Sequence, residues 1–422
     1  MKTPSFPPSP VEPDLEHPSF REALAFWFKL GWISFGGTAG HIAIMHDYLV
    51  DRKQWISNSK FFHALSICML LPGPEAQQLA IYVGSLLHGK KGGVVAGVLF
   101  VLPSMCILLA LSIVYVSFGG VPWMYALFGG LKPAVIALIV VALVKVGRKS
   151  LHSALHYGVA VLAFVCIFFF NVPLPLIILG TLAIGFFSRR SLPGETSEPV
   201  AAEPFSWRAF FLLALVFAVL WAAPLALFYV SGDFTFWRGL VLFFTQAALF
   251  TIGGSYTVLP YVAQFAVLKF GWLSRAQMVD GFALAETTPG PLIIVVGFVG
   301  FMAGYNHFHA SVLLGSIALV ATTYYTFLPC FFYIFAGAPL IDRSHSSKAL
   351  SGILGLVAAA VVGVILNLTI FLGRDVLLPG GHFDGFAFAW ILLSLGLVLW
   401  GRMNVVYLIL ISLGVGLARY LV

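Results

Sequence analysis

Long apolar runs alternate with short polar segments along almost the whole chain. An α-helix rises 1.5 Å per residue, so a run of about 20 apolar residues can cross the hydrocarbon core of a bilayer. The runs predict an all-α integral membrane protein with about 13 transmembrane helices. These helices are expected near residues 20–45, 61–88, 94–117, 124–144, 154–170, 174–188, 209–230, 238–262, 278–303, 310–336, 349–372, 384–400 and 404–421.

Two polar segments divide the chain. Residues 1–18 hold six prolines and three acidic residues, which predicts a disordered cytoplasmic arm. Residues 189–208 predict a cytoplasmic linker. The remaining segments, 19–188 and 209–422, are expected to be two repeats, and the second has an extra leading helix.

The composition excludes most soluble proteins. Hydrophobic residues make up 60% of the chain and charged residues 9%, whereas soluble domains average about 25% charged residues. We therefore exclude a soluble enzyme, a disordered protein and a nucleic-acid-binding domain. The net charge of +7 comes from basic residues scattered between apolar runs, as in the cytoplasmic loops of membrane proteins.

The distribution of Lys and Arg predicts a cytoplasmic N-terminus and a C-terminus on the other side. With 13 crossings, 15 basic residues fall on the N-terminal side and six on the other. Arg52, Lys53 and Lys60 fall on the outer side against this bias. We interpret Arg52 and Lys53 as a basic vestibule that recruits anions, with ordinary surface charge as the alternative. Lys29 and Lys132 lie inside predicted helices, and we expect them to extend toward the interface.

The two segments share a repeated pattern. A shift of 217 residues aligns nine identical positions between residues 26 and 74 with the second half. The matches include Gly36-Gly37 with Gly253-Gly254 and Pro72-Gly73-Pro74 with Pro289-Gly290-Pro291. The matching helices are the first and the eighth, so they are expected to run in opposite directions. Inverted repeats with broken helices at the midplane are typical of many secondary transporters.

Glycine and proline pairs interrupt four of the predicted helices. Backbone groups freed at such breaks need partners, so they are expected to line an enclosed cavity, and helix N-termini suit an anion. The alternative is a kink at a tight helix crossing. The breaks and adjacent polar residues give these candidates for substrate binding: Gly36, Gly37, Thr38, Pro72, Gly73, Pro74, Gln77, Gln78, Gly253, Gly254, Ser255, Thr288, Pro289, Gly290 and Pro291.

Two carboxylates lie beside the Pro-Gly-Pro motifs. Glu75 follows the first motif and Glu286 precedes the second. Ionisable residues inside membrane helices suggest function by default, and we expect Glu286 or Glu75 to couple transport to protons. The alternative is a structural role, with Glu75 stabilising a helix N-terminus. No metal-ligand spacing and no nucleotide or redox motif occurs, so no metal, cofactor or enzymatic activity is expected.

The motifs together resemble the chromate ion transporter family. The resemblance rests on FGG followed by HIAIMHDYLVDRKQWIS and LLPGPEAQQLAIYVG, and on IGG followed by WLSRAQMVDGFALAETTPGPL. It implies a bacterial inner-membrane protein that exports chromate, with sulfate as a related dianion. Thr38 stands where the family pattern leads us to expect proline, and His41, Asp47 and Ser104 also depart from it.

Several alternatives remain open from the sequence. A carrier for sulfate or another anion has the same architecture, and broken helices also allow an anion channel. A membrane-embedded chromate reductase is disfavoured because a redox motif is missing. The lipid bilayer and the anion are the expected partners, nucleic acid is not, and a homodimer is left open.

Overall fold

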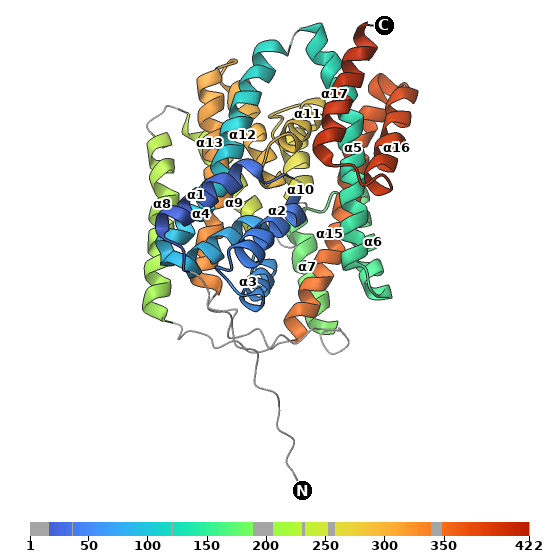
Figure 1. Ribbon diagram of the computed structural model, residues 1–422. Helices are drawn as coiled ribbons and strands as arrows, with labels where there is room; N and C mark the ends of the chain where they lie inside the picture. The colour runs from blue at the N-terminus through green and yellow to red at the C-terminus, as the bar shows by residue number, and fades with distance from the viewer. Residues whose placement is uncertain are drawn as a thin grey trace.

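The computed structural model describes residues 17–35, 37–119, 121–188, 206–229, 233–251, 258–338 and 348–421 (Figure 1). Within these ranges the chain forms helices and their connections, with no strand. Five of the described helices are long and apolar enough to cross a membrane, and several shorter apolar helices accompany them. The predicted class, an all-α multi-pass membrane protein, is confirmed. Residues 1–16 of the predicted arm and 189–205 of the linker lie outside the described residues.

The first half contains seven helices and one π-helical extension. They are α1 (Phe20–Ile33), α2 (Gly37–His46) with the extension η1 (Asp47–Arg52), α3 (Asn58–Leu70), α4 (Glu75–Phe118), α5 (Pro122–Ser150), α6 (Ala154–Phe170) and α7 (Leu174–Ser188). The chain reverses inside α4 at His88 and Gly89, where Gly89 has a φ of 61°. Gly84 then packs against Gly92 so closely that a Cβ on Gly84 would lie 2.7 Å from the Gly92 carbonyl oxygen.

The second half follows the same order after one additional helix, α8 (Trp207–Tyr229). Its first elements are α9 (Phe234–Leu249), α10 (Val258–Gln264), η2 (Phe265–Lys269), α11 (Arg275–Glu286), η3 (Leu292–Ile294) and α12 (Val295–His307). The remaining described elements are α13 (Val312–Phe332), η4 (Tyr333–Gly337), α15 (Lys348–Leu377), η5 (Pro379–Gly381), α16 (Gly385–Leu399) and α17 (Val405–Leu421).

The helices α1 and α2 form a hairpin rather than one crossing. Lys53, which follows η1, lies 3.0 Å from the carboxylate of Glu22 in the first turn of α1. The ring of Phe26 stacks on Tyr48 with centroids 4.2 Å apart. The ends of a crossing helix are separated by about 30 Å. The prediction that residues 20–45 cross the membrane is therefore wrong.

The other three interrupted segments also return to the end where they began. His88 contacts the same region of α1 as Lys53 does, through a 3.0 Å interaction with the Pro18 carbonyl and an edge contact with Phe20. In the second half, His307 lies 2.6 Å from Asp233, and Asn306 donates a 2.7 Å hydrogen bond to the Trp272 carbonyl. The segments 61–88, 238–262 and 278–303 are thus hairpins, and the count of 13 crossings is wrong for the same reason.

This reversal removes the anomaly in the charge distribution. Arg52, Lys53 and Lys60 lie at the same end of the molecule as Lys90, because the hairpin returns there. Their predicted placement on the opposite side is wrong. The charges of Arg52 and Lys53 also have acidic partners, with Arg52 2.8 Å from Asp47.

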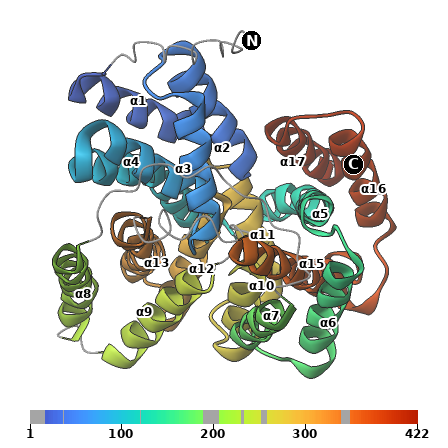
Figure 2. The ribbon, with the colours of Figure 1, turned by 90° about the horizontal axis from the view of Figure 1, so that it is seen from below.

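A six-helix bundle flanks the hairpins and is built from both halves (Figure 2). The helices α5, α6 and α7 pack against α15, α16 and α17, and α5 and α15 also contact α11. Small residues allow the backbones to approach: a Cβ on Gly130 of α5 would lie 2.6 Å from the Gly416 nitrogen of α17. The bundle therefore supports the second-half hairpins, through the contacts of α10 and α11.

Candidate functional site

The four hairpins meet at their turns, which we call tips. The first and second proline tips are residues 71–74 and 287–291, and the first and second glycine tips begin at Ser34 and Thr251. The Gly73 N–H donates a 2.6 Å hydrogen bond to the Thr251 carbonyl, and the Gly290 N–H donates one of the same length to the Ser34 carbonyl. Each proline tip is therefore bonded to the glycine tip of the other half.

The backbone of both proline tips requires glycine at its centre. Gly73 has a φ of +127° and Gly290 a φ of +98°, a region that favours residues without a Cβ. Proline follows each glycine and opens the next helical segment: Pro74 is the N-cap of α4, and Pro291 is the N-cap of η3. The sequence prediction that Pro-Gly-Pro ends one helix and begins another is confirmed.

Residues of α4 and α13 close the back of each proline tip. A Cβ on Gly290 would lie 2.0 Å from the Ser104 hydroxyl, and one on Gly73 would lie 2.9 Å from the Cys330 sulfur. Both contacts join opposite halves. The sequence reading noted Ser104 only as an unusual residue and missed Cys330. The shared signal is Leu-Pro followed by a small polar residue, at 102–104 and 328–330.

Polar side chains are buried around the first proline tip. The Gln78 amide donates to the Pro72 carbonyl at 2.5 Å, and the Gln77 amide to the Gly97 carbonyl at 3.5 Å. The side-chain oxygens of both glutamines and the Ser104 hydroxyl have no hydrogen-bond partner within the described part of the chain. Buried polar atoms usually have partners. Of these three atoms, only the Ser104 hydroxyl can donate a hydrogen bond to an anion, because the glutamine oxygens are acceptors.

The threonines at the second proline tip bond to their own helix. Thr288 donates to the Ala285 carbonyl at 2.8 Å and Thr287 to the Leu284 carbonyl at 2.6 Å. Their hydroxyl hydrogens are therefore used locally, and only their oxygen lone pairs remain for other groups.

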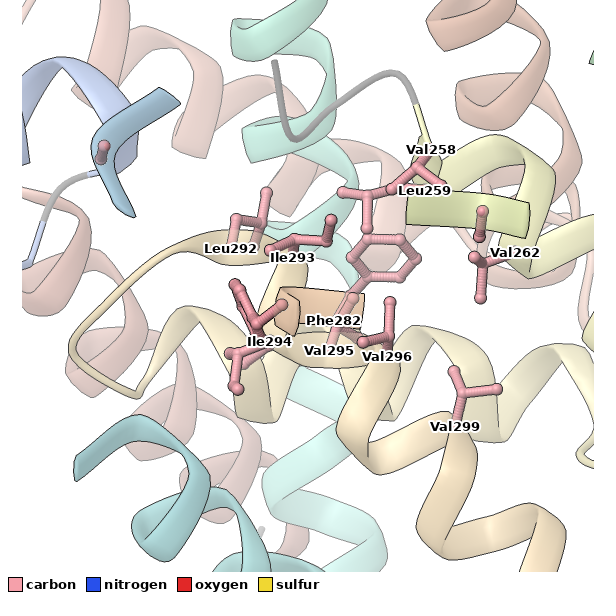
Figure 3. Close-up of a cluster of buried hydrophobic side chains, with 14 of the residues drawn as sticks. Val258, Leu259, Val262, Phe282, Leu292, Ile293, Ile294, Val295, Val296 and Val299 are labelled. Carbon is pink, nitrogen blue, oxygen red and sulfur yellow. The ribbon is translucent and has the colours of Figure 1, made fainter. Parts of the chain in front are cut away.

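An apolar wall encloses one side of the second proline tip (Figure 3). Val258, Leu259 and Val262 of α10 face Phe282 of α11 and the consecutive residues 292–296, and all of these side chains are buried. Water is excluded from this side, so electrostatic interactions at the tip are stronger than in bulk solvent.

The two glutamates occupy opposite helix ends. Glu75 is the first residue of α4 and Glu286 the last residue of α11, and both are half-buried. The positive charge of Lys149 acts on Glu75 and that of Lys145 on Glu286, one turn apart on α5. A carboxylate is stabilised at a helix N-terminus and destabilised at a C-terminus. Glu286 is thus the better placed of the two to exchange a proton.

The remaining candidates lie in two places. Gly37, with a φ of +72°, and Thr38 open α2 directly after the first glycine tip. Gly36, Gly253, Gly254 and Ser255 lie outside the described residues. Arg52 ends η1 and Lys53 follows it, so both lie at the far end of α2 and η1 from the first glycine tip.

The sequence reading missed a charged cluster that joins the two halves. The ammonium of Lys132 on α5 lies 3.2 Å from the carboxylate of Asp280 on α11. The Tyr115 hydroxyl of α4 donates a 2.9 Å hydrogen bond to the same carboxylate. Asp280 is 5% exposed. An acidic residue inside an apolar run was the available signal, but its partner is distant in sequence.

Among the described residues, no three His, Cys, Asp or Glu side chains gather as they would around a metal ion.

The family model described as Chromate transporter matches residues 21–186 and 238–417, which include all four tips. The chain belongs to the chromate transporter family. No solved structure matches it.

Three curated relatives extend this chromate transporter comparison. A chromate transport protein of Pseudomonas aeruginosa is 32% identical over 86% of this chain and 83% of its own. A chromate transport protein of Cupriavidus metallidurans is 30% identical over 84% of this chain and 83% of its own. A probable chromate transport protein of Synechococcus elongatus is 30% identical over 85% of this chain and 86% of its own.

Proposed function

We propose that this chromate transporter exports chromate across the bacterial inner membrane and binds it where the four tips meet. The observation that carries the proposal is the pair of crossed hydrogen bonds from Gly73 and Gly290. They bring two interrupted segments of each half to one place. The names of the relatives support chromate as the substrate.

The proposed binding site uses neutral donors and helix ends. The first turns of α4 and η3 begin directly after the proline tips, and the free N–H groups of such turns favour anions. Gln77 and Gln78 each donate one amide N–H to a protein carbonyl, and the second N–H of each amide is the donor that we assign to the anion. Such groups replace the hydration shell of a divalent oxyanion without fixing it by opposite charge, so release remains fast.

We further propose that the halves are inverted repeats. The first-half hairpins enter from the end that carries Lys53 and Lys90, and the second-half hairpins enter from the end that carries Asp233 and His307. Four helical segments of the first half and five of the second then cross the membrane. The cluster of basic residues at the first end supports a cytoplasmic location for that end and for the N-terminus, and a periplasmic C-terminus.

The crossed bonds suggest how access alternates. Both hydrogen bonds are formed in this structure, so each proline tip is bonded to a glycine tip of the other half. Opening the Gly73–Thr251 contact would free one pair of tips, and opening the Gly290–Ser34 contact would free the other. In an inverted-repeat transporter, exchanging the conformations of two such pairs exposes the site to opposite sides in turn.

The deciding experiment is radiolabelled chromate flux in inverted membrane vesicles, with and without a proton gradient. We expect concentrative uptake into the vesicles that depends on the gradient and is inhibited by sulfate. A pocket of neutral donors separates chromate and sulfate weakly, so uptake of both ions has to be measured. Sulfate uptake without chromate uptake would assign the chain to the sulfate alternative. Anion conductance in planar bilayers without coupling would assign it to the channels.

A further inference from the structure

A polar pocket lies between the two halves, away from the tips. It has a volume of about 220 Å³ and lies between α4, α5, α11 and α12. Its lining includes the polar side chains of Lys132, Asp280, Gln277, Asn306 and three tyrosines, Tyr115, Tyr125 and Tyr305. Because Gly119 and Asn306 belong to it, it lies at the end of the molecule where the second-half hairpins enter. We call it the Lys132 pocket, and it has room for several water molecules.

The charges around Asp280 are few and unevenly exposed. Lys132 faces it from α5 and Tyr115 from α4, while Tyr125 of α5 and Tyr305 of α12 line the same pocket. On α11 itself the nearest basic residue is Arg275, which pairs with Asp375 of α15 at 3.3 Å. The side chain of Lys132 is 25% exposed and that of Asp280 is 7% exposed.

The lysine therefore faces the water of the pocket, with the carboxylate behind it. One oxygen of Asp280 accepts the Tyr115 hydroxyl, and the other makes no hydrogen bond of good geometry among the described residues, although Lys132 lies 3.2 Å away. The Lys132 ammonium carries three N–H donors, so it can meet a second anion in the pocket as well as the carboxylate.

We propose that the Lys132 pocket is a second binding site for a divalent oxyanion, in which the anion and Asp280 compete for Lys132. The substrate class rests on the function proposed above. When the anion binds Lys132, Asp280 takes up one proton from the pocket water. When the anion leaves, Asp280 returns that proton to the water and pairs with Lys132 again.

Electrostatics requires this exchange. A dianion beside Lys132 would lie next to the carboxylate of Asp280, and like charges at such distances disfavour ionisation. Neutral Asp280 removes the repulsion and leaves Lys132 unpaired. By thermodynamic linkage, the proton and the anion then favour each other's binding to the same extent.

The position of the pocket relates it to the transport path. Asp280 and Glu286 lie six residues apart on α11, which is about 9 Å along the helix axis. The pocket thus lies between the second proline tip and the end of the molecule where the second-half hairpins enter.

The test is sulfate binding to detergent-purified protein, measured by calorimetry from acidic to alkaline pH. For the wild type, we expect the affinity to fall as the pH rises, by at most about tenfold per pH unit for one linked proton. Asp280→Asn should lose this pH dependence and keep tight binding at alkaline pH. Lys132→Gln should lose the pH-dependent binding, and Lys132→Arg should retain it.

Two further variants protect the test against simple misfolding. Tyr115→Phe removes a hydrogen bond to the ionised carboxylate, so binding should persist to higher pH. Arg275→Gln removes a charge from the same helix outside the pocket, and its pH profile should match the wild type. The proposal is overturned if Asp280→Asn keeps the wild-type pH dependence, or if folded Lys132→Gln binds sulfate as the wild type does.

The outcomes separate this inference from the proposed function. Proton-linked sulfate binding without chromate flux would leave the pocket intact and refute chromate export. Chromate flux with pH-independent binding would refute the pocket alone.

Discussion

Gly73 and Gly290 each combine a positive φ with a close contact to the opposite half. Either condition alone disfavours a side chain, and together they exclude one. The same residues donate the two crossed hydrogen bonds. Conformation, packing and hydrogen bonding at the tips thus depend on the same two positions.

We expect Gly290→Val to abolish chromate flux while the protein still inserts into the membrane. A Cβ there meets the Ser104 hydroxyl, and the backbone strain alone costs about 1–3 kcal/mol. Flux in vesicles and the amount of protein in the membrane are the measurements. Gly129→Ala in α5 is the control, because a Cβ there meets nothing within 4 Å. Wild-type flux in Gly290→Val would refute the site.

We expect Glu286→Gln to flatten the pH dependence of transport. The amide cannot exchange a proton, and Glu286 is the carboxylate at the unfavourable helix end. Initial rates of chromate flux across a pH series measure this effect. Glu75→Gln is the matched variant and should change the pH profile less. An unchanged profile for Glu286→Gln would remove this residue from coupling.

Sequence reasoning located the tips but not their partners. The Gly and Pro residues of the tips can be recognised from their residue type and from their repetition in the second half, and the glutamates from their charge inside an apolar segment. Cys330, Lys132 and Asp280 act through contacts with the other half. Asp280 and Tyr115, for example, are 165 residues apart in the sequence. Such pairs depend on how the halves pack, which local residue patterns do not encode.

At the scale of elements, hydropathy predicted helices well and their direction poorly. The expected segments 154–170 and 174–188 coincide with α6 and α7. The interrupted segments have the length and apolarity of a crossing, but their central breaks let the chain turn back. Hydropathy shows that a segment is long enough to cross the membrane. Only the contacts of its two ends show whether it crosses or returns to the same side.

The hairpins can be tested with cysteines at their bases. In a background without the native cysteines, Lys60→Cys and Lys90→Cys should react with an impermeant maleimide from the same side, and Lys269→Cys from the other. All three side chains are exposed. Labelling in right-side-out and inverted vesicles gives the answer. Reaction of Lys60→Cys and Lys90→Cys from opposite sides would restore a crossing between them.

A second element-scale prediction concerns the bond that joins α9 to α12. Hydrogen bonds from His307 and the Phe236 N–H lower the pKa of Asp233 below its usual 3.8. Its contribution to stability is therefore present above about pH 4 and is lost as the pH falls through the lowered pKa. The pair is exposed, so the effect is less than about 1 kcal/mol.

Thermal unfolding in detergent from neutral to acidic pH measures this contribution. His307→Ala should be slightly less stable than the wild type at neutral pH, and the difference should shrink in acid. An equal difference at all pH values would show that the hydrogen bond to Asp233 contributes nothing.

At the scale of the molecule, the two halves interlock at several places. The crossed bonds of the tips, the contacts of Ser104 and Cys330, and the pairing of α5 with α17 each join one half to the other. The internal repeat could be read from the sequence. The interlocking of its copies could not, because identical spacing is compatible with two separate domains.

Helix α8 makes its main contacts within the second half. It has no buried residue, and it contacts α9, α13 and η4 at the edge of the molecule (Figure 2). In the proposed topology the first half crosses the membrane an even number of times. A second copy attached directly to it would therefore have the same orientation in the membrane as the first. One further crossing turns that copy over. On this view α8 adds little to the site or to packing, and a gene fusion of two like units would have needed just such a spacer to become a working inverted pair.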